Sequence, residues 1–131
     1  VYAIADEMMR EITDGLNLII DAMESDMTND YRLYVKSIFV FIKENEFIYR
    51  NLADSPDAAY FIGKIKQVIT KRVFSNVNSP YLSKNKNERQ VQINFLAHAC
   101  VDTMVDYFKG DINLTFDEFA NVILGILNRI V

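Results

Sequence analysis

The sequence is poor in residues that interrupt helices or cross-link a chain, with four glycines, two prolines and one cysteine among 131 residues. An all-β domain needs a turn signal about every 8–12 residues, so this shortage argues against a β fold. The lone Cys100 excludes an internal disulfide framework and a cysteine-based zinc site, and it fits a reducing, cytoplasmic setting. No apolar run reaches the roughly 18 residues of a membrane span, and the first residues lack a signal-peptide pattern.

Apolar residues recur along most of the chain at steps of three and four residues, which is the period of an amphipathic helix. The first such series consists of Ile4, Met8, Ile12, Leu16, Ile19 and Met23. The pattern predicts helices over 2–24, 30–50, 56–74, 88–108 and 115–131, with a loop over 75–87. The predicted fold class is therefore all-α, in one domain.

Local signals mark several of these helix ends. Ser55 is a suitable N-cap residue, and Pro56 after it suits the first helical position, where no N–H is needed. Gly110 stands where a residue in the left-handed conformation would end the helix over 88–108. Thr115 and Glu118 have the spacing of a capping box, which predicts the start of the last helix.

The net charge of −4 is unevenly distributed along the chain. Residues 1–31 carry eight acids and one base, residues 32–89 five acids and eleven bases, and residues 90–131 five acids and two bases. The bases are spread over two helices and a loop instead of forming one block. We interpret them as a solvated surface and predict no nucleic-acid contact by this chain.

The last two predicted helices carry more apolar residues than one neighbouring layer can bury. Apolar side chains occur on both arcs of the helix over 88–108 and on more than half the circumference of the last helix. Surplus apolar surface of this kind favours an isologous dimer, although both helices could instead be central in a monomer. The predicted interface residues are Val91, Phe95, His98, Asp102, Val105, Phe119, Ile123 and Ile126.

A set of aromatic and sulfur-containing side chains on the middle helices could line a ligand pocket, because such pockets are mostly apolar with a few polar groups. The same spacing is also compatible with an ordinary core. The candidate ligand-binding residues are Tyr34, Phe39, Tyr49, Phe61, Met104 and Tyr107. The phenol groups of the three tyrosines could orient a ligand.

No residue pattern predicts catalysis or a cofactor. The chain has one histidine, and it has no phosphate-binding glycine loop, nucleophile elbow or H-E-x-x-H motif. His98, Asp102 and Asp106 follow one another at four-residue steps and could supply metal ligands. We favour a polar stripe at an interface or in solvent and predict no metal site. Titration of His98 near neutral pH could make such an interface pH-sensitive.

Several segments together resemble the C-terminal domain of TetR/AcrR-family transcriptional regulators. They are the stretch FIKENEFIYRNL over 41–52, Gly110, Leu114-Thr115 and Glu118-Phe119-Ala120. The subgroup typified by dihydroxyacetone-kinase activators is the most similar, since it has a comparable stretch at the end of a helix. The chain departs from the family where a glycine-rich patch and a tryptophan are common, because it has Ala97-His98-Ala99 and Tyr107-Phe108 there.

This resemblance implies a bundle of five or six helices that senses a small-molecule effector and forms a homodimer through its last two helices. DNA would be bound only by an N-terminal helix-turn-helix domain, which is absent from this chain, and no membrane is involved. The chain begins with Val1 instead of Met, directly at the first predicted helix, so we expect a fragment whose first helix connects to that domain. The alternative function is a stand-alone helical module that binds another protein through its last two helices.

Overall fold

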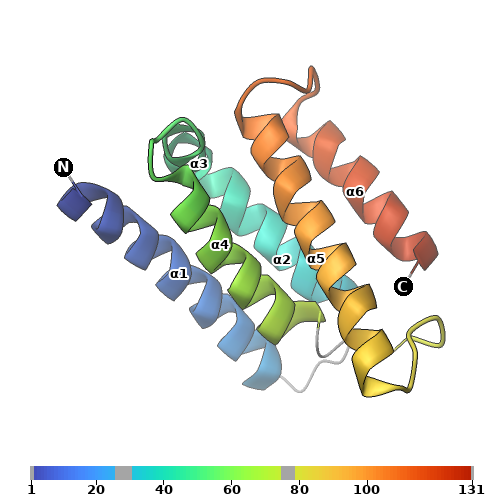
Figure 1. Cartoon of the computed structure of the whole chain (residues 1–131). Coiled ribbons are helices and arrows are strands. Elements are labelled where there is room, and N and C mark those ends of the chain that lie inside the picture. Colours follow the sequence, from blue (N-terminus) through green and yellow to red (C-terminus); the bar gives the residue numbers. More distant parts are fainter. Residues whose placement is uncertain (1, 26–30, 75–78, 131) are drawn as a thin grey trace.

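The computed structural model describes residues 2–25, 31–74 and 79–130. These residues form six α-helices and one π-helical turn, and they contain no strand (Figure 1). The bounds are α1 (Tyr2–Ser25), α2 (Tyr31–Glu44), α3 (Glu46–Ala53), α4 (Ala58–Val68), η1 (Ile69–Val73), α5 (Lys86–Phe108) and α6 (Phe116–Ile130). The predicted all-α fold class is confirmed, with six helices. None of the described helices is long and apolar enough to cross a membrane.

The helices pack as a bundle in which α1 and α6 lie on opposite sides (Figure 1). α1 contacts α2 and α4, while α6 contacts α2 and follows α5 in a helical hairpin. Buried aliphatic and aromatic side chains from every helix form one continuous core. In α1 the residues that enter this core are Ile12, Leu16 and Ile20, which agrees with the helical period of the sequence.

One glycine sets the distance between the first two helices. The Phe41 ring of α2 lies so close to Gly15 of α1 that an added Cβ would be 2.5 Å from it. Real Cβ atoms do not come so near another carbon, so any larger residue at this position would force α1 and the ring apart. The small residue therefore fixes how closely α1 approaches the bundle.

The helix predicted over 30–50 is instead two helices, and they are divided at Asn45. The Asn45 amide donates to the backbone oxygen of Phe41 at 2.8 Å, while its backbone N–H is shared between the oxygens of Phe41 and Ile42. Asparagine side chains compete with the backbone in this way and so interrupt helices. After the interruption α3 directs Tyr49 and Leu52 into the core.

The predicted helix start at Ser55 is also wrong, because α4 begins at Ala58. The Ser55 hydroxyl does accept a backbone hydrogen bond, from the N–H of Asp57 at 3.1 Å, but it closes a turn instead of capping a helix. At its other end α4 passes directly into η1, so the helical path reaches Val73, close to the predicted end.

Side-chain caps define the start of α5 and α6. The Asn85 side chain accepts from the backbone N–H groups of Asn87 and Glu88, both at 3.0 Å, and α5 therefore begins two residues before its predicted start. The predicted capping box of α6 is confirmed. The N–H of Glu118 donates to the Thr115 hydroxyl at 3.2 Å, and the Glu118 carboxylate accepts from the N–H of Thr115 at 3.0 Å.

The α5–α6 hairpin is held by its turn and by a contact to α2. Gly110 follows α5 with φ +88°, the left-handed conformation that was predicted for it. Lys43 at the end of α2 forms an ion pair with Asp117 in the first turn of α6 at 2.9 Å. These local features place α6 beside α5 and leave one side of each helix facing away from the bundle.

Candidate functional site

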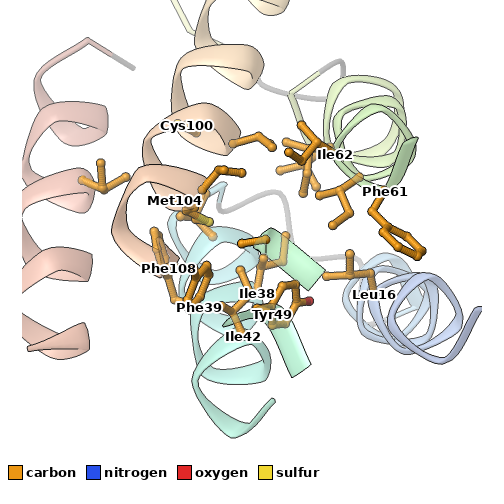
Figure 2. A pocket seen from close by; sticks show the side chains of 18 of the residues that line it. Leu16, Ile38, Phe39, Ile42, Tyr49, Phe61, Ile62, Cys100, Met104 and Phe108 are labelled. Carbon is orange, nitrogen blue, oxygen red and sulfur yellow. The ribbon is translucent and has the colours of Figure 1, made fainter. Parts of the chain in front are cut away.

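A cavity of about 80 Å³ lies where the helices of the bundle meet (Figure 2). Leu16 of α1, Tyr49 of α3 and Met104 of α5 converge on it from three directions. α2, α4, η1 and α6 supply the remaining walls. Apolar cavities of this kind stay dry, because water needs several polar partners. The space is therefore available to an apolar molecule.

The lining that the described residues supply is almost entirely hydrocarbon and includes no charged side chain. Among these lining residues Tyr49 is the only one whose side chain carries an oxygen, and Cys100 and Met104 contribute sulfur. Burial raises the pKa of Tyr49 far above its ordinary value and that of Cys100 to about 11. Both groups therefore remain neutral under ordinary conditions, and the cavity offers no charge to a ligand.

The Tyr49 hydroxyl has no hydrogen-bond partner within the described part of the chain. The residue is only 8% exposed, so solvent does not replace the missing partner. Its ring stacks on Phe108 with centroids 5.5 Å apart, and this contact fixes the ring in place. An unsatisfied buried hydroxyl costs about 1–3 kcal/mol, which a hydrogen-bonding ligand would recover in part.

The structure brings together four of the predicted ligand-binding residues. Phe39, Tyr49, Phe61 and Met104 all line the cavity, and they come from four different helices (Figure 2). The side chain of Tyr34 lies outside what the structure describes. No ligand is present, so the binding role of these residues stays a prediction.

Tyr107, the remaining candidate, lies outside the cavity. It is buried in an aromatic cluster at the turn of the α5–α6 hairpin, where its ring stacks on Phe119 at 4.6 Å and meets Phe116 edge-on. The Arg50 guanidinium lies 5.4 Å from the Tyr107 ring centroid and donates to the backbone oxygen of Phe108. The position of Tyr107 supports a role in joining the hairpin to α3.

Sequence reasoning missed the aliphatic part of the lining. Ile69 and Val73 of η1 and Leu127 of α6 line the cavity, although their spacing is that of ordinary core residues. Ile123 lines it too, although the sequence had suggested an interface for this residue. No signal in the sequence separates a residue beside a cavity from one in a filled core.

A second apolar region lies on the outer side of α5 and α6. Val91 and Phe95 of α5 are 69% and 74% exposed, and Val122 and Ile126 of α6 are 53% and 49% exposed. The polar residues His98 and Asp102 of α5 are exposed as well. We call this set of six residues the outer face. Large apolar side chains that cluster on a surface are typical of protein–protein interfaces.

Three of the predicted interface residues point inward instead. Phe119 and Ile123 are only 3% and 8% exposed and belong to the chain's own core, while Val105 is half-buried beside the cavity. A side chain buried this far offers a partner almost no surface. The structure therefore divides the wide apolar arc of α6 into a side that packs on its own chain and a side that faces outward.

The polar stripe on α5 does not gather into a metal site. The Asp102 carboxylate forms an ion pair with Lys66 of α4 at 2.8 Å. Among the described residues, no group of three His, Cys, Asp or Glu side chains could hold a metal ion. This member of the outer face instead joins α5 to α4.

A comparison with protein families decides what kind of protein has this bundle. The TetR-type family model described as a transcriptional regulator C-terminal region matches residues 29–129, from before α2 almost to the end of α6. The chain belongs to this TetR-type regulatory family. No curated protein and no solved structure matches it.

In this TetR-type domain, Arg72 of η1 bonds to three side chains of α1. Arg72 of η1 donates to the Asn17 side chain at 2.8 Å, to Asp21 at 2.6 Å and to Glu24 at 3.2 Å. The hydrogen bond to Asp21 is the main reason that the pKa of Arg72 is raised. Since Ile69 and Val73 of the same π-helical turn line the cavity, η1 connects the cavity wall to α1.

Proposed function

We propose that this TetR-type domain binds a small-molecule effector in the central cavity and forms a homodimer through α5 and α6. DNA binding would belong to an N-terminal domain that precedes α1, and the protein would act in the cytoplasm. The resemblance of residues 41–52 to dihydroxyacetone-kinase activators supports that subgroup as the finer assignment. The observation that carries the proposal is the apolar cavity at the junction of the helices.

The size of the cavity suggests how binding could be transmitted. About 80 Å³ is more than one water needs but less than the roughly 150 Å³ of an engineered apolar cavity that takes up benzene. A ligand of that size or larger has to displace lining side chains. Because Ile69 and Val73 belong to the wall, such a displacement would act on η1 and, through Arg72, on α1.

The proposed mechanism is a shift between two arrangements of α1. A ligand changes such an equilibrium only by binding one arrangement more tightly than the other. The cavity supplies this difference if it is wider in one arrangement, since a wider cavity accepts the ligand at a smaller packing cost. In a dimer the spacing of the two DNA-binding domains would then depend on α1.

The outer face supports the proposed dimer. Its four apolar side chains are all exposed, and the most exposed of them is Phe95, at 74%. A two-fold axis would place identical outer faces together in an isologous contact. Light scattering on the chain at tens of micromolar should therefore give twice the mass of one copy. A single-copy mass would favour the alternative module that binds a different protein.

The effector site can be tested with benzene as the probe and with a matched pair of substitutions. Ala53 lines the cavity, whereas Ala59 is exposed on α4. In the wild-type chain, benzene should shift the methyl resonances of lining residues and change amide exchange in α1. Ala53→Leu should fill the space and abolish both effects, and Ala59→Leu should leave both intact. Binding without any response in α1 would contradict the proposed mechanism.

The assignment to a two-domain regulator has a simpler test. The reading frame upstream of Val1 should encode a helix-turn-helix domain. Its absence would end the regulator interpretation.

A further inference from the structure

The chemistry of the cavity wall restricts which effector this site can take. In the part of the wall that the structure describes, every side chain except three is a plain hydrocarbon, and the exceptions are Tyr49, Cys100 and Met104. A buried charge needs a counter-charge or several hydrogen bonds, and the wall supplies neither. An anionic or cationic effector is therefore disfavoured in the cavity.

The same wall also disfavours a molecule with many hydroxyl groups. Each buried polar group without a partner loses its hydrogen bonds to water and gains nothing in return. Tyr49 is the only strong hydrogen-bonding side chain among the described residues of the wall, and a thiol such as Cys100 is a weak donor. The site can satisfy one polar group of a ligand and leaves a second or third unpaired.

The Tyr49 hydroxyl could satisfy that one group once a ligand displaces the neighbouring side chains, because its oxygen is fully buried in the chain without a ligand. It is buried, it has no partner among the described residues, and the stacked Phe108 ring holds the phenol in position. A hydroxyl that already has a fixed orientation pays little conformational entropy when it binds. As a donor, it would pair with an oxygen or nitrogen that carries a lone pair.

We infer that the effector is an uncharged, mainly apolar molecule with one hydrogen-bond acceptor, which accepts from the Tyr49 hydroxyl. This inference rests on the proposed effector site. The three stated properties follow from three features of the wall. Among the described lining residues, the lack of charged side chains favours a neutral ligand, the hydrocarbon surface favours an apolar body, and the one side-chain oxygen allows one acceptor.

The inference is tested with four small probes at neutral pH, and binding is followed through the methyl resonances of lining residues. Benzene and pyridine have the same size and shape, but only pyridine has an acceptor. Toluene and N-methylpyridinium also match in size, but only the second is charged. Benzene, toluene and pyridine should bind, and N-methylpyridinium should not.

The role of Tyr49 is tested with Tyr49→Phe, and Tyr60→Phe serves as the control because Tyr60 is exposed on α4. Tyr49→Phe should weaken pyridine binding by about two- to tenfold, the effect of one net hydrogen bond, and should not weaken benzene binding. Tyr60→Phe should leave both affinities unchanged.

Two results would overturn this inference while leaving the effector site in place. The first is that N-methylpyridinium binds the wild-type chain as tightly as toluene does, a measurement that needs no variant. The other is an unchanged affinity of Tyr49→Phe for pyridine. If benzene and toluene also fail to enter, the effector site itself is refuted, so the two failures can be told apart.

Discussion

The central cavity and the outer face are both apolar, but they differ in shape. The side chains around the cavity leave it unfilled, and the apolar side chains of the outer face are exposed. The cavity is a hollow of about 80 Å³ walled by side chains from every described helix, whereas the outer face displays whole side chains such as Phe95. A hollow suits a small molecule, and an exposed face suits a protein surface. Shape, more than apolar character, therefore separates the two proposed functions.

α5 takes part in both regions, which explains its composition. Val101 and Met104 face the cavity, while Val91 and Phe95 face away from the bundle. A helix that is apolar on two sides has little amphipathic contrast, so its sequence alone does not show which side is buried. Surplus apolar residues on one helix can therefore serve two different partners, here the proposed small molecule on one side and the proposed second copy of the chain on the other.

The largest effect is expected from a charge placed on the outer face. Phe95→Glu should weaken dimerisation by about 100-fold or more, because a carboxylate would have to be buried without a counter-charge. Phe47→Glu is the matched control, since Phe47 is 78% exposed on α3 and outside the outer face. Sedimentation equilibrium of both variants measures the dissociation constants. Equal weakening by the two substitutions would remove the outer face from the interface.

The interior has its own test, through the titration of Cys100 on the cavity wall. Burial raises the pKa of this thiol from its ordinary value of 9.0 to about 11. The folded chain therefore holds the proton more tightly than the unfolded chain, and stability falls as pH rises from about 9 to about 11. The loss amounts to about 2 kcal/mol for a shift of this size.

Urea unfolding at several pH values measures this dependence. Cys100→Ala should show a shallower loss of stability over the same range, because the other alkaline groups are unchanged. Identical slopes for the two chains would mean that the thiol is open to water in the folded chain.

Features that are determined by neighbouring residues could be predicted from the sequence. The α6 capping box needs only Thr115 and Glu118, and the end of α5 needs only Gly110. The division at Asn45 and the turn at Ser55 could not be predicted, because each depends on a competition between side-chain and backbone hydrogen bonds. At both positions the prediction followed the helical spacing of the apolar residues.

The candidate site was predictable only in part, for a different reason. The period of α4 places Phe61 on its inner side, but whether inner side chains leave a gap depends on how all the helices pack. The position of Ile123 shows the same limit, since a wide apolar arc on α6 does not reveal which part meets a partner. Cavities and interfaces are properties of the assembled bundle.

The link between the cavity and α1 gives a smaller predicted effect. Arg72→Gln removes the ion pairs to Asp21 and Glu24, both partly exposed, so the loss of stability should be about 1 kcal/mol. Lys84→Gln, on the turn before α5, is the control for removing one positive charge. High salt should shrink the difference between wild type and Arg72→Gln, because exposed ion pairs are screened.

Amide exchange shows whether this link has a function. Arg72→Gln should speed exchange in α1 and should uncouple α1 from benzene, while benzene still binds in the cavity. An α1 response to benzene that persists in Arg72→Gln would mean that another contact, such as Gly15 against Phe41, carries the signal.

The smallest effect compares two glycines inside helices, where an added Cβ would meet nothing within 4 Å. Gly63 lies in α4, and Gly125 lies in α6 between the outer-face residues Val122 and Ile126. Alanine at either site should raise the stability of an isolated chain by about 0.5–1 kcal/mol, because glycine costs more conformational entropy in a helix. Only Gly125→Ala should also weaken dimerisation, since the added methyl group would stand against the second copy. Sedimentation equilibrium of the two variants decides this, and an unchanged dimer in Gly125→Ala would restrict the interface to α5.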